Sequence, residues 1–251
     1  MVLSVGCIGK PSPTRLGYYP TADNNSYTNN NNLPPLPNQQ KSTPKPINTI
    51  ETKPVQPGAK SVKTEAGLSP SEIYERLSSA VFKIHTSTGY EGFQGSGFFI
   101  SNDGIAVSNY HVFQGTTIGY ENIILSDGST YKLAEVYHKN EEYDFIIFKV
   151  NINQEVNYIK IANTTPKVGE KIYTIGSPLG LDNTFSSGEI SQIRENGNIL
   201  QISAPIDHGS SGGVLLNSKG EAVGITSGGI DTSGANLNYA WNIRLVKPYI
   251  P

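Results

Sequence analysis

Residues 95–108 read GSGFFISNDGIAVS and contain the pattern that decides the fold. Two short, largely apolar runs, Gly95–Ile100 and Ile105–Ser108, flank the sequence Asn102-Asp103-Gly104. Asp-Gly between such runs is a strong hairpin signal, because glycine readily adopts the positive φ that a tight turn requires. The stretch therefore predicts two antiparallel strands joined by a tight turn.

The same pattern of a short apolar run followed by turn residues recurs outward from this hairpin. Strands are expected over 81–85, 123–125, 131–137, 145–150, 171–175, 188–193, 199–203, 214–216, 222–226 and 239–243. One short helix should precede them, because Ser69-Pro70-Ser71-Glu72 has the form of a capping box with proline in the first helical position. About twelve short strands without crossover helices predict an all-β fold of closed antiparallel barrels rather than a parallel sheet.

The first 67 residues differ in composition from the rest. Ten of the sixteen prolines lie between Pro11 and Pro57, together with four consecutive asparagines at 29–32. Such a segment has too little apolar surface to offset the entropy lost on ordering. We therefore expect residues 1–67 to be a disordered Asn/Pro-rich tail or tether. Residues 68–251 should form the folded domain, with one barrel over about 81–155 and a second over about 160–245.

The composition also argues against several classes of protein. The formal net charge is −2, which offers no basic surface for nucleic acid. The single cysteine, Cys7, allows no intramolecular disulfide and no cysteine-based zinc site. No apolar run is long enough to predict a transmembrane span.

The first seven residues, MVLSVGC, allow two interpretations. Gly6 before Cys7 resembles the end of a bacterial lipoprotein signal, and the tether-like composition that follows favours a lipid anchor at Cys7. The charged start and longer apolar stretch of such a signal are missing. Either the start lies downstream of the true one, which places the protein in the bacterial cell envelope or periplasm, or Cys7 is an ordinary tail residue and the protein is cytoplasmic.

Three short motifs carry candidate catalytic residues. The sequence DHGSSGG at 207–213 places Ser211 in a glycine-rich turn, where its hydroxyl is accessible and backbone N–H groups can converge on an oxyanion. His111 lies at the end of an expected strand, and Asp144 directly precedes the apolar strand 145–150. Each motif alone is more typical of a turn, cap or structural residue. Their order, with separations of 33 and 67 residues, is that of the chymotrypsin layout.

Taken together, these motifs resemble those of the HtrA/DegP-type bacterial proteases, which are trypsin-like serine proteases. The resemblance covers about residues 69–251 and runs in order through 95–100, 109–112, 144–150, 176–180, 187–191, 209–213 and 220–225. It implies a chymotrypsin fold of two antiparallel six-stranded barrels. It also implies a serine endopeptidase, here without the PDZ domain that usually follows the protease in HtrA proteins.

The resemblance further assigns roles to individual residues. His111, Asp144 and Ser211 would form a catalytic triad that works through an acyl-enzyme, with the N–H groups of Gly209 and Ser211 as the oxyanion hole and no metal or organic cofactor. The substrate-binding residues would be Pro205, Ile206, His208, Thr226, Ser227 and Gly228. Pro205 stands where enzymes that cleave after Arg or Lys carry a carboxylate, so a buried positive side chain would have no partner. We therefore expect cleavage of unfolded or extended polypeptides after small or aliphatic residues.

Two other functions remain open on the sequence alone. A catalytically silent binding or chaperone protein could keep the protease fold, although the intact triad argues against it. An esterase could use the same triad. Peptide bonds are favoured because a substrate strand can pair with the sheet edge near residues 226–228.

Overall fold

The computed structural model describes residues 67–117, 119–177, 183–230 and 237–251. The expected tail, including Cys7, lies outside these residues apart from Gly67. The described chain opens with α1 (Pro70–Leu77) and the 3-10 turn η1 (Ser78–Ala80). Ser69 and Glu72 form the predicted capping box, which provides hydrogen-bond partners for free backbone N–H groups at the helix start. No helix in these ranges is long and apolar enough to cross a bilayer.

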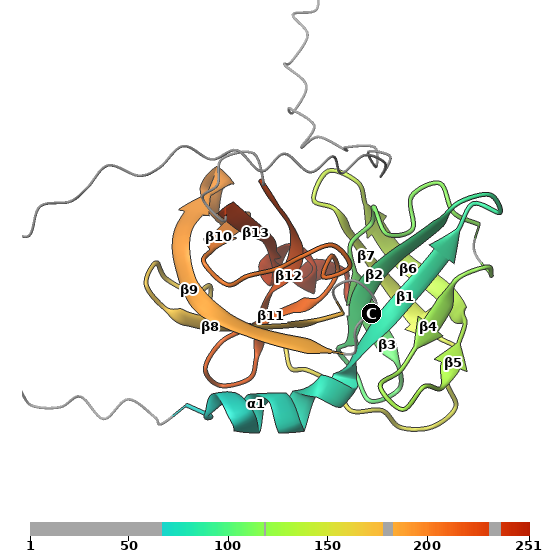
Figure 1. Cartoon of the computed structure of the whole chain (residues 1–251), viewed down its shortest axis with the longest axis horizontal. Helices are drawn as coiled ribbons and strands as arrows, with labels where there is room; N and C mark the ends of the chain where they lie inside the picture. The colour runs from blue at the N-terminus through green and yellow to red at the C-terminus, as the bar shows by residue number, and fades with distance from the viewer. Residues whose placement is uncertain (1–66, 118, 178–182, 231–236) are drawn as a thin grey trace, which may run out of the picture. The chain divides into compact units, whose positions relative to one another are not determined.

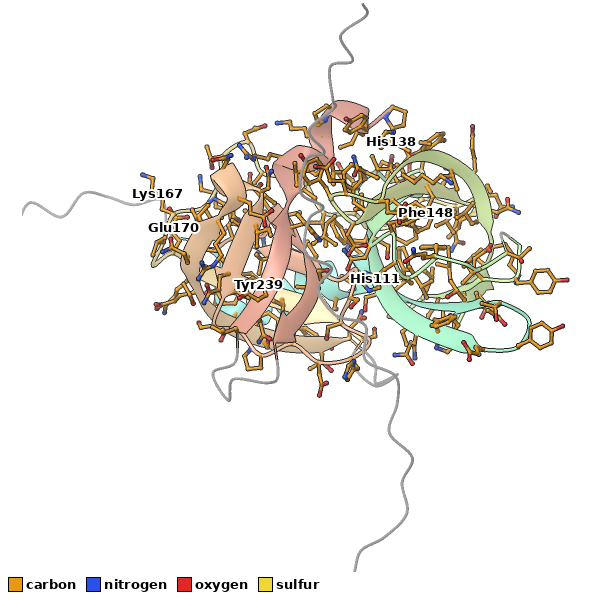
Figure 2. The ribbon with its side chains drawn as sticks, turned by 90° about the horizontal axis from the view of Figure 1, so that it is seen from above. His111, His138, Phe148, Lys167, Glu170 and Tyr239 are labelled. Atoms are coloured by element: carbon orange, nitrogen blue, oxygen red, sulfur yellow. The ribbon has the colours of Figure 1, made fainter. Side chains whose placement is uncertain are left out.

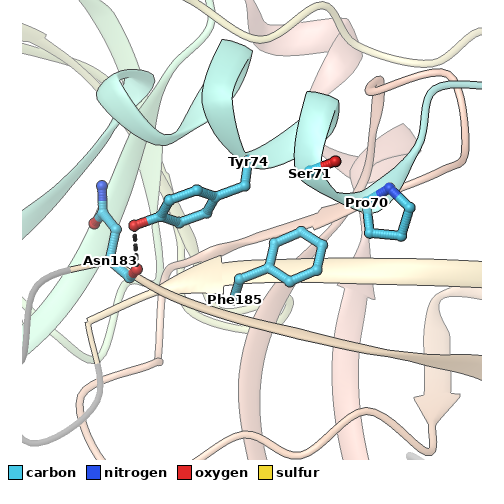
Figure 3. A pocket seen from close by; sticks show the side chains of 5 residues that line it. All are labelled: Pro70, Ser71, Tyr74, Asn183 and Phe185. Carbon is cyan, nitrogen blue, oxygen red and sulfur yellow. Dashed lines mark hydrogen bonds between the residues drawn. The ribbon is translucent and has the colours of Figure 1, made fainter.

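Helix α1 packs on the start of a strand in the second half of the chain (Figure 3). The Tyr74 hydroxyl donates a hydrogen bond to the carbonyl oxygen of Asn183 at 3.1 Å. The Tyr74 ring meets that of Phe185 edge to face, with centroids 6.0 Å apart. These contacts hold the helix against the molecule although only Ile73 within it is buried.

Two β-structures follow the helix and lie side by side (Figure 1). The first contains β1 (Val81–Ser87), β2 (Gly92–Phe99), β3 (Ile105–Ser108), β4 (Asn122–Ile124), β5 (Thr130–Tyr131), β6 (Leu133–Asn140) and β7 (Phe145–Val150). They form one antiparallel sheet in the order β5-β4-β1-β2-β3-β7-β6. The predicted hairpin is present as β2 and β3, with Phe98 opposite Val107.

This first sheet differs from the expected closed six-stranded barrel. The strand expected over 131–137 is interrupted at Lys132, so that β5 pairs with β4 and β6 pairs with β7. Buried Glu121 contributes to this arrangement through two hydrogen bonds. Its side-chain carboxylate accepts one from the backbone N–H of Leu133 at 2.9 Å, and its backbone carbonyl oxygen accepts one from Lys132 Nζ at 2.6 Å. The result is a curled seven-stranded sheet whose edge strands are joined through one residue. In the described chain no ladder closes it.

The second structure is the predicted closed six-stranded barrel. Its strands are β8 (Lys171–Gly176), β9 (Thr184–Arg194), β10 (Ile199–Ile202), β11 (Val214–Leu216), β12 (Ala222–Ile230) and β13 (Leu237–Asn242). They close in the order β10-β13-β12-β11-β8-β9. The all-β, two-part fold expected from the sequence is thus confirmed. Short 3-10 turns, η3 (Glu195–Gly197), η5 (Ile243–Leu245) and η6 (Lys247–Tyr249), complete the described elements.

A shared apolar cluster joins the two structures. It includes Phe98 and Ile147 of the first sheet with Ile175, Val214 and Ile225 of the second barrel, all fully buried. Each structure also has its own core, one centred on Phe82 and Phe148 and the other on residues such as Leu200 and Leu215. Because the shared cluster is continuous, the residues at the ends of β3, β7 and β11 are held at fixed relative positions.

Candidate active site

Figure 2 shows His111 at the seam between the two β-structures, and Asp144 is hydrogen-bonded to it. His111 follows β3, and Asp144 immediately precedes β7, which pairs with β3. One carboxylate oxygen of Asp144 lies 2.8 Å from Nδ1 of His111, and the other accepts a hydrogen bond from the backbone N–H of His111 at 2.9 Å. Both oxygen atoms of the Asp144 carboxylate are therefore used to orient His111.

The backbone of Asp144 is itself unusual. Its φ is 47°, in the left-handed region that aspartate tolerates better than most residues. The carbonyl oxygen of Asp144 accepts a hydrogen bond from Nδ2 of fully buried Asn109 at 2.8 Å. Among the residues that the structure describes, no donor reaches Oδ1 of Asn109. Asn109 thus stabilises the backbone conformation of Asp144 through this bond, a role that the sequence did not indicate.

Ser227 links Asp144 to the other half of the molecule. Its hydroxyl donates to the Oδ2 atom of Asp144 at 3.0 Å, and its carbonyl oxygen accepts a hydrogen bond from the Ser211 hydroxyl at 2.9 Å. Ser211, Ser227, Asp144 and His111 therefore form one connected hydrogen-bond network. The sequence placed Ser227 only beside the substrate, because its contact with Asp144 spans 83 residues of chain.

Ser211 lies in a tight turn whose glycines are needed for steric reasons. Gly209 and Gly212 have φ values of 93° and 86°, which side chains strongly disfavour. A Cβ atom at Gly212 would also overlap the carbonyl oxygen of Ser96 and the hydroxyl of Ser108. The turn can therefore pack directly against β2 and the end of β3 only with glycine at position 212.

Two backbone N–H groups of this turn have no hydrogen-bond partner among the described residues. No acceptor among the described residues is hydrogen-bonded to the N–H of Gly209 or Ser211. The neighbouring N–H groups are used differently: that of Ser210 donates to Asp207 and that of Gly213 donates to Ser210, both at 2.9 Å. The two donors predicted for an oxyanion hole are thus without a protein partner.

The other predicted site residues lie around the same turn. Pro205 and His208 are exposed, whereas Ile206 is half-buried and packs against the core of the second barrel. Thr226 is buried, and its hydroxyl donates to the carbonyl oxygen of Ser210 at 2.6 Å. Gly228 is exposed on β12, where the pairing with β13 shifts register.

The remaining histidines have separate surroundings. His85 is exposed on β1, and the His138 ring stacks on Tyr249 with centroids 3.8 Å apart. Figure 2 shows His138 well away from His111. Over the described ranges, no three His, Cys, Asp or Glu side chains cluster in a way that could hold a metal ion.

Comparison with known proteins identifies relatives of this chain. Residues 95–225 match the family described as a trypsin-like peptidase domain. A probable periplasmic serine endoprotease, DegP-like, from Rhizobium meliloti is 34% identical over 157 residues, covering 60% of this chain and 31% of that protein. A probable serine protease, do-like, from Buchnera aphidicola is 35% identical over 158 residues, covering 59% of this chain and 32% of that protein.

A solved structure has the same fold. The serine endoprotease from Yersinia pestis superposes with a TM-score of 0.65 and 25% identity, covering 73% of this chain and 66% of that one. The matched part of the chain spans about a third of the length of the curated relatives.

Proposed function

This chain belongs to the trypsin-like peptidase domain family and is HtrA-like, and from that premise we propose that it is a serine endopeptidase with Ser211, His111 and Asp144 as its triad. The observation that carries the proposal is the double contact of the Asp144 carboxylate with the backbone N–H and Nδ1 of His111. A carboxylate on Nδ1 keeps the proton on that nitrogen, so that Nε2 can act as a base.

The reaction begins when the Ser211 hydroxyl turns from the Ser227 carbonyl toward Nε2 of His111. His111 removes the hydroxyl proton as Ser211 Oγ bonds to the substrate carbonyl carbon, which produces a tetrahedral oxyanion. The protonated imidazole then donates that proton to the leaving amine, and the peptide C–N bond breaks. Water, deprotonated by His111, attacks the acyl-enzyme in turn and releases the carboxylic acid with Ser211 restored.

The oxyanion would be bound by the N–H groups of Gly209 and Ser211. Because neither donor is engaged within the described protein, binding of the oxyanion breaks no hydrogen bond between described residues. Removing one such donor typically costs about 3 kcal/mol of transition-state stabilisation.

An extended polypeptide is the substrate that the surroundings favour. Its backbone would pair with β12 at Ser227 and Gly228, beyond Thr226, whose N–H and carbonyl oxygen are already bonded to Gly213 and Gly212. The side chain before the cleaved bond would lie between this part of β12 and Pro205 and Ile206, with His208 near the cleaved bond. Neither Pro205 nor Ile206 can neutralise a charge, so cleavage after Val, Ala, Ile or Leu is expected, with discrimination among them of only about 1–3 kcal/mol per methylene.

Ser211→Ala tests the assignment of the nucleophile. The variant should keep the melting temperature of the wild-type protein while losing labelling by an organophosphonate probe and digestion of casein. Labelling of the wild-type protein without casein cleavage would favour an esterase. No labelling at all would favour a silent binding protein, and wild-type cleavage by Ser211→Ala would refute the triad.

Cleavage-site profiling tests the specificity. Mass spectrometry of an unfolded protein digested by the wild-type enzyme should show aliphatic residues before the cleaved bond, and the Ser211→Ala digest supplies the background. Dominant cleavage after Arg, Lys or Glu would contradict the proposed pocket.

We further propose a cell-envelope location, since the relative from Rhizobium meliloti is named as periplasmic. Cys7, where one of the two interpretations of the first seven residues places a lipid anchor, lies outside the described residues. Fractionation of cells that produce either the wild-type protein or Cys7→Ser distinguishes a lipid anchor at Cys7 from an ordinary tail residue. An anchor predicts that only the wild-type protein is found with membranes.

A further inference from the structure

Ser96 lies in the middle of β2 and is fully buried against the catalytic turn of the other β-structure. Its backbone N–H donates to the carbonyl oxygen of Ser211 at 2.7 Å. Its own carbonyl oxygen accepts a hydrogen bond from the Ser108 hydroxyl at 2.7 Å. These are main-chain bonds of Ser96, which most residue types could make at this position.

The hydroxyl of Ser96 makes two further bonds that require this side chain. It donates to the carbonyl oxygen of Gly209 at 2.7 Å and accepts from the N–H of Ser177 at 2.9 Å. A serine hydroxyl has one proton to donate, so its donor is fully used by Gly209. Gln94, two residues earlier and thus on the same face of β2, donates from Nε2 to the Ser177 carbonyl oxygen at 3.0 Å.

These bonds hold the turn at both ends. The Ser96 hydroxyl restrains the Gly209 carbonyl, and the Ser96 N–H restrains the Ser211 carbonyl. Of residues 209–211, Gly209 has the greatest backbone freedom, and a rotation there would redirect the N–H groups of the proposed oxyanion hole. Preorganised donors stabilise an oxyanion because they need no reorganisation during the reaction.

We propose that Ser96 is a positioning residue that holds the Gly209–Ser211 turn in its oxyanion-binding conformation and couples this turn to Ser177 at the end of β8. The inference rests on the proposed function, because it assumes that the turn binds an oxyanion. Ser96 itself does not touch the substrate. It acts through the orientation of two backbone amides.

Ser96→Ala tests the role, because it removes both hydroxyl bonds and leaves the backbone bonds in place. We expect kcat for a peptide substrate to fall about tenfold with KM unchanged, as for the loss of one good hydrogen bond. The affinity for a peptide aldehyde, which forms an oxyanion on Ser211, should fall by about the same factor. The affinity for the matching peptide carboxamide should stay within about twofold, because it makes no oxyanion.

Two further measurements separate positioning from general destabilisation. The amide of Ser177 should exchange with deuterium faster in Ser96→Ala, as resolved by NMR, because its acceptor is gone. Glu121→Gln is the control, since it alters a buried side chain that bonds to backbone N–H groups far along the first sheet. It should lower the melting temperature and leave the ratio of aldehyde to carboxamide affinity unchanged.

Ser96→Cys keeps a donor at this position, weaker and on a somewhat larger atom, and should be intermediate, which preserves the test should Ser96→Ala fail to fold. An active wild-type enzyme whose aldehyde affinity is unchanged in Ser96→Ala or Ser96→Cys would overturn the role of Ser96 alone. A wild-type protein that neither cleaves peptides nor binds the aldehyde would overturn the proposed function and this inference together.

Discussion

Asp144 accepts more hydrogen bonds than any other residue of the candidate triad. Its carboxylate accepts hydrogen bonds from His111 and Ser227, and its carbonyl oxygen accepts one from Asn109. The side chain is 17% exposed, whereas that of His111 is 43% exposed. The carboxylate is thus largely shielded from water, and the histidine it orients remains accessible to a substrate.

Asp144→Asn should preserve the fold and remove most of the activity. An amide can present an N–H to Nδ1 of His111, which favours the tautomer that cannot accept the Ser211 proton, and kcat should fall about 10⁴-fold. Steady-state rates on a peptide substrate, together with melting temperatures, measure both effects. Ser227→Ala removes only one of the three bonds to the carboxylate and should cost about tenfold. A rate for Asp144→Asn within tenfold of wild type would be incompatible with its role.

At the scale of elements, the hairpin of β2 and β3 shows how a local signal is reinforced by distant contacts. The Ser101 hydroxyl bonds to the carboxylate of Asp103 within the turn. Lys149, on the adjacent strand β7, lies 2.6 Å from the same carboxylate. The hydrogen bonds from Lys149 and then Ser101 hold the pKa of Asp103 below its ordinary value of 3.8.

This lowered pKa predicts a pH-dependent contribution to stability. Because the folded protein binds the Asp103 proton more weakly than the unfolded chain, the stabilisation is fully present above about pH 4 and is lost as the pH falls through the lower folded pKa. The effect should be at most about 1 kcal/mol, since Asp103 is 58% exposed and water screens the pair. Denaturant unfolding of wild type and Asp103→Asn measures it. A difference that grows as the pH falls would contradict the sign.

At the scale of the whole molecule, the shared apolar cluster makes the two β-structures interdependent. Ile147 of β7 belongs to this cluster together with Val214 and Ile225 from the second barrel. The hydrogen bond from Ser96 to Ser211 crosses the same seam. The candidate site is therefore positioned by the packing between the structures as well as within each of them.

Ile147→Ala should lower the free energy of unfolding by about 2–5 kcal/mol, because it opens a cavity in this cluster. Calorimetry should still show a single transition if the two structures unfold together. Tyr90→Ala is the control, since Tyr90 is 99% exposed and its loss should change stability by less than about 0.5 kcal/mol. Two separated transitions in Ile147→Ala would show that the structures unfold independently.

The sequence by itself determined most of the strands, the helix start and the order of the three candidate catalytic residues. Those features depend on local patterns: a capping box at Ser69, an Asp-Gly turn at 103–104, and apolar runs short enough to be strands. The tight turn around Ser211 was visible as well, because its glycines are a local requirement of the backbone.

Tertiary structure alone decided which distant groups meet. Four hydrogen bonds that the sequence did not indicate join residues from 11 to 113 positions apart. They are the bond from Lys132 to Glu121 at the break between β5 and β6, the bond from Ser227 to Asp144, and the bonds of Ser96 with Gly209 and Ser177. Such contacts depend on strand register and on the fit between two packed β-structures. Short-range periodicity specifies neither, because a hydrogen bond across a seam depends on where the whole of each sheet is placed.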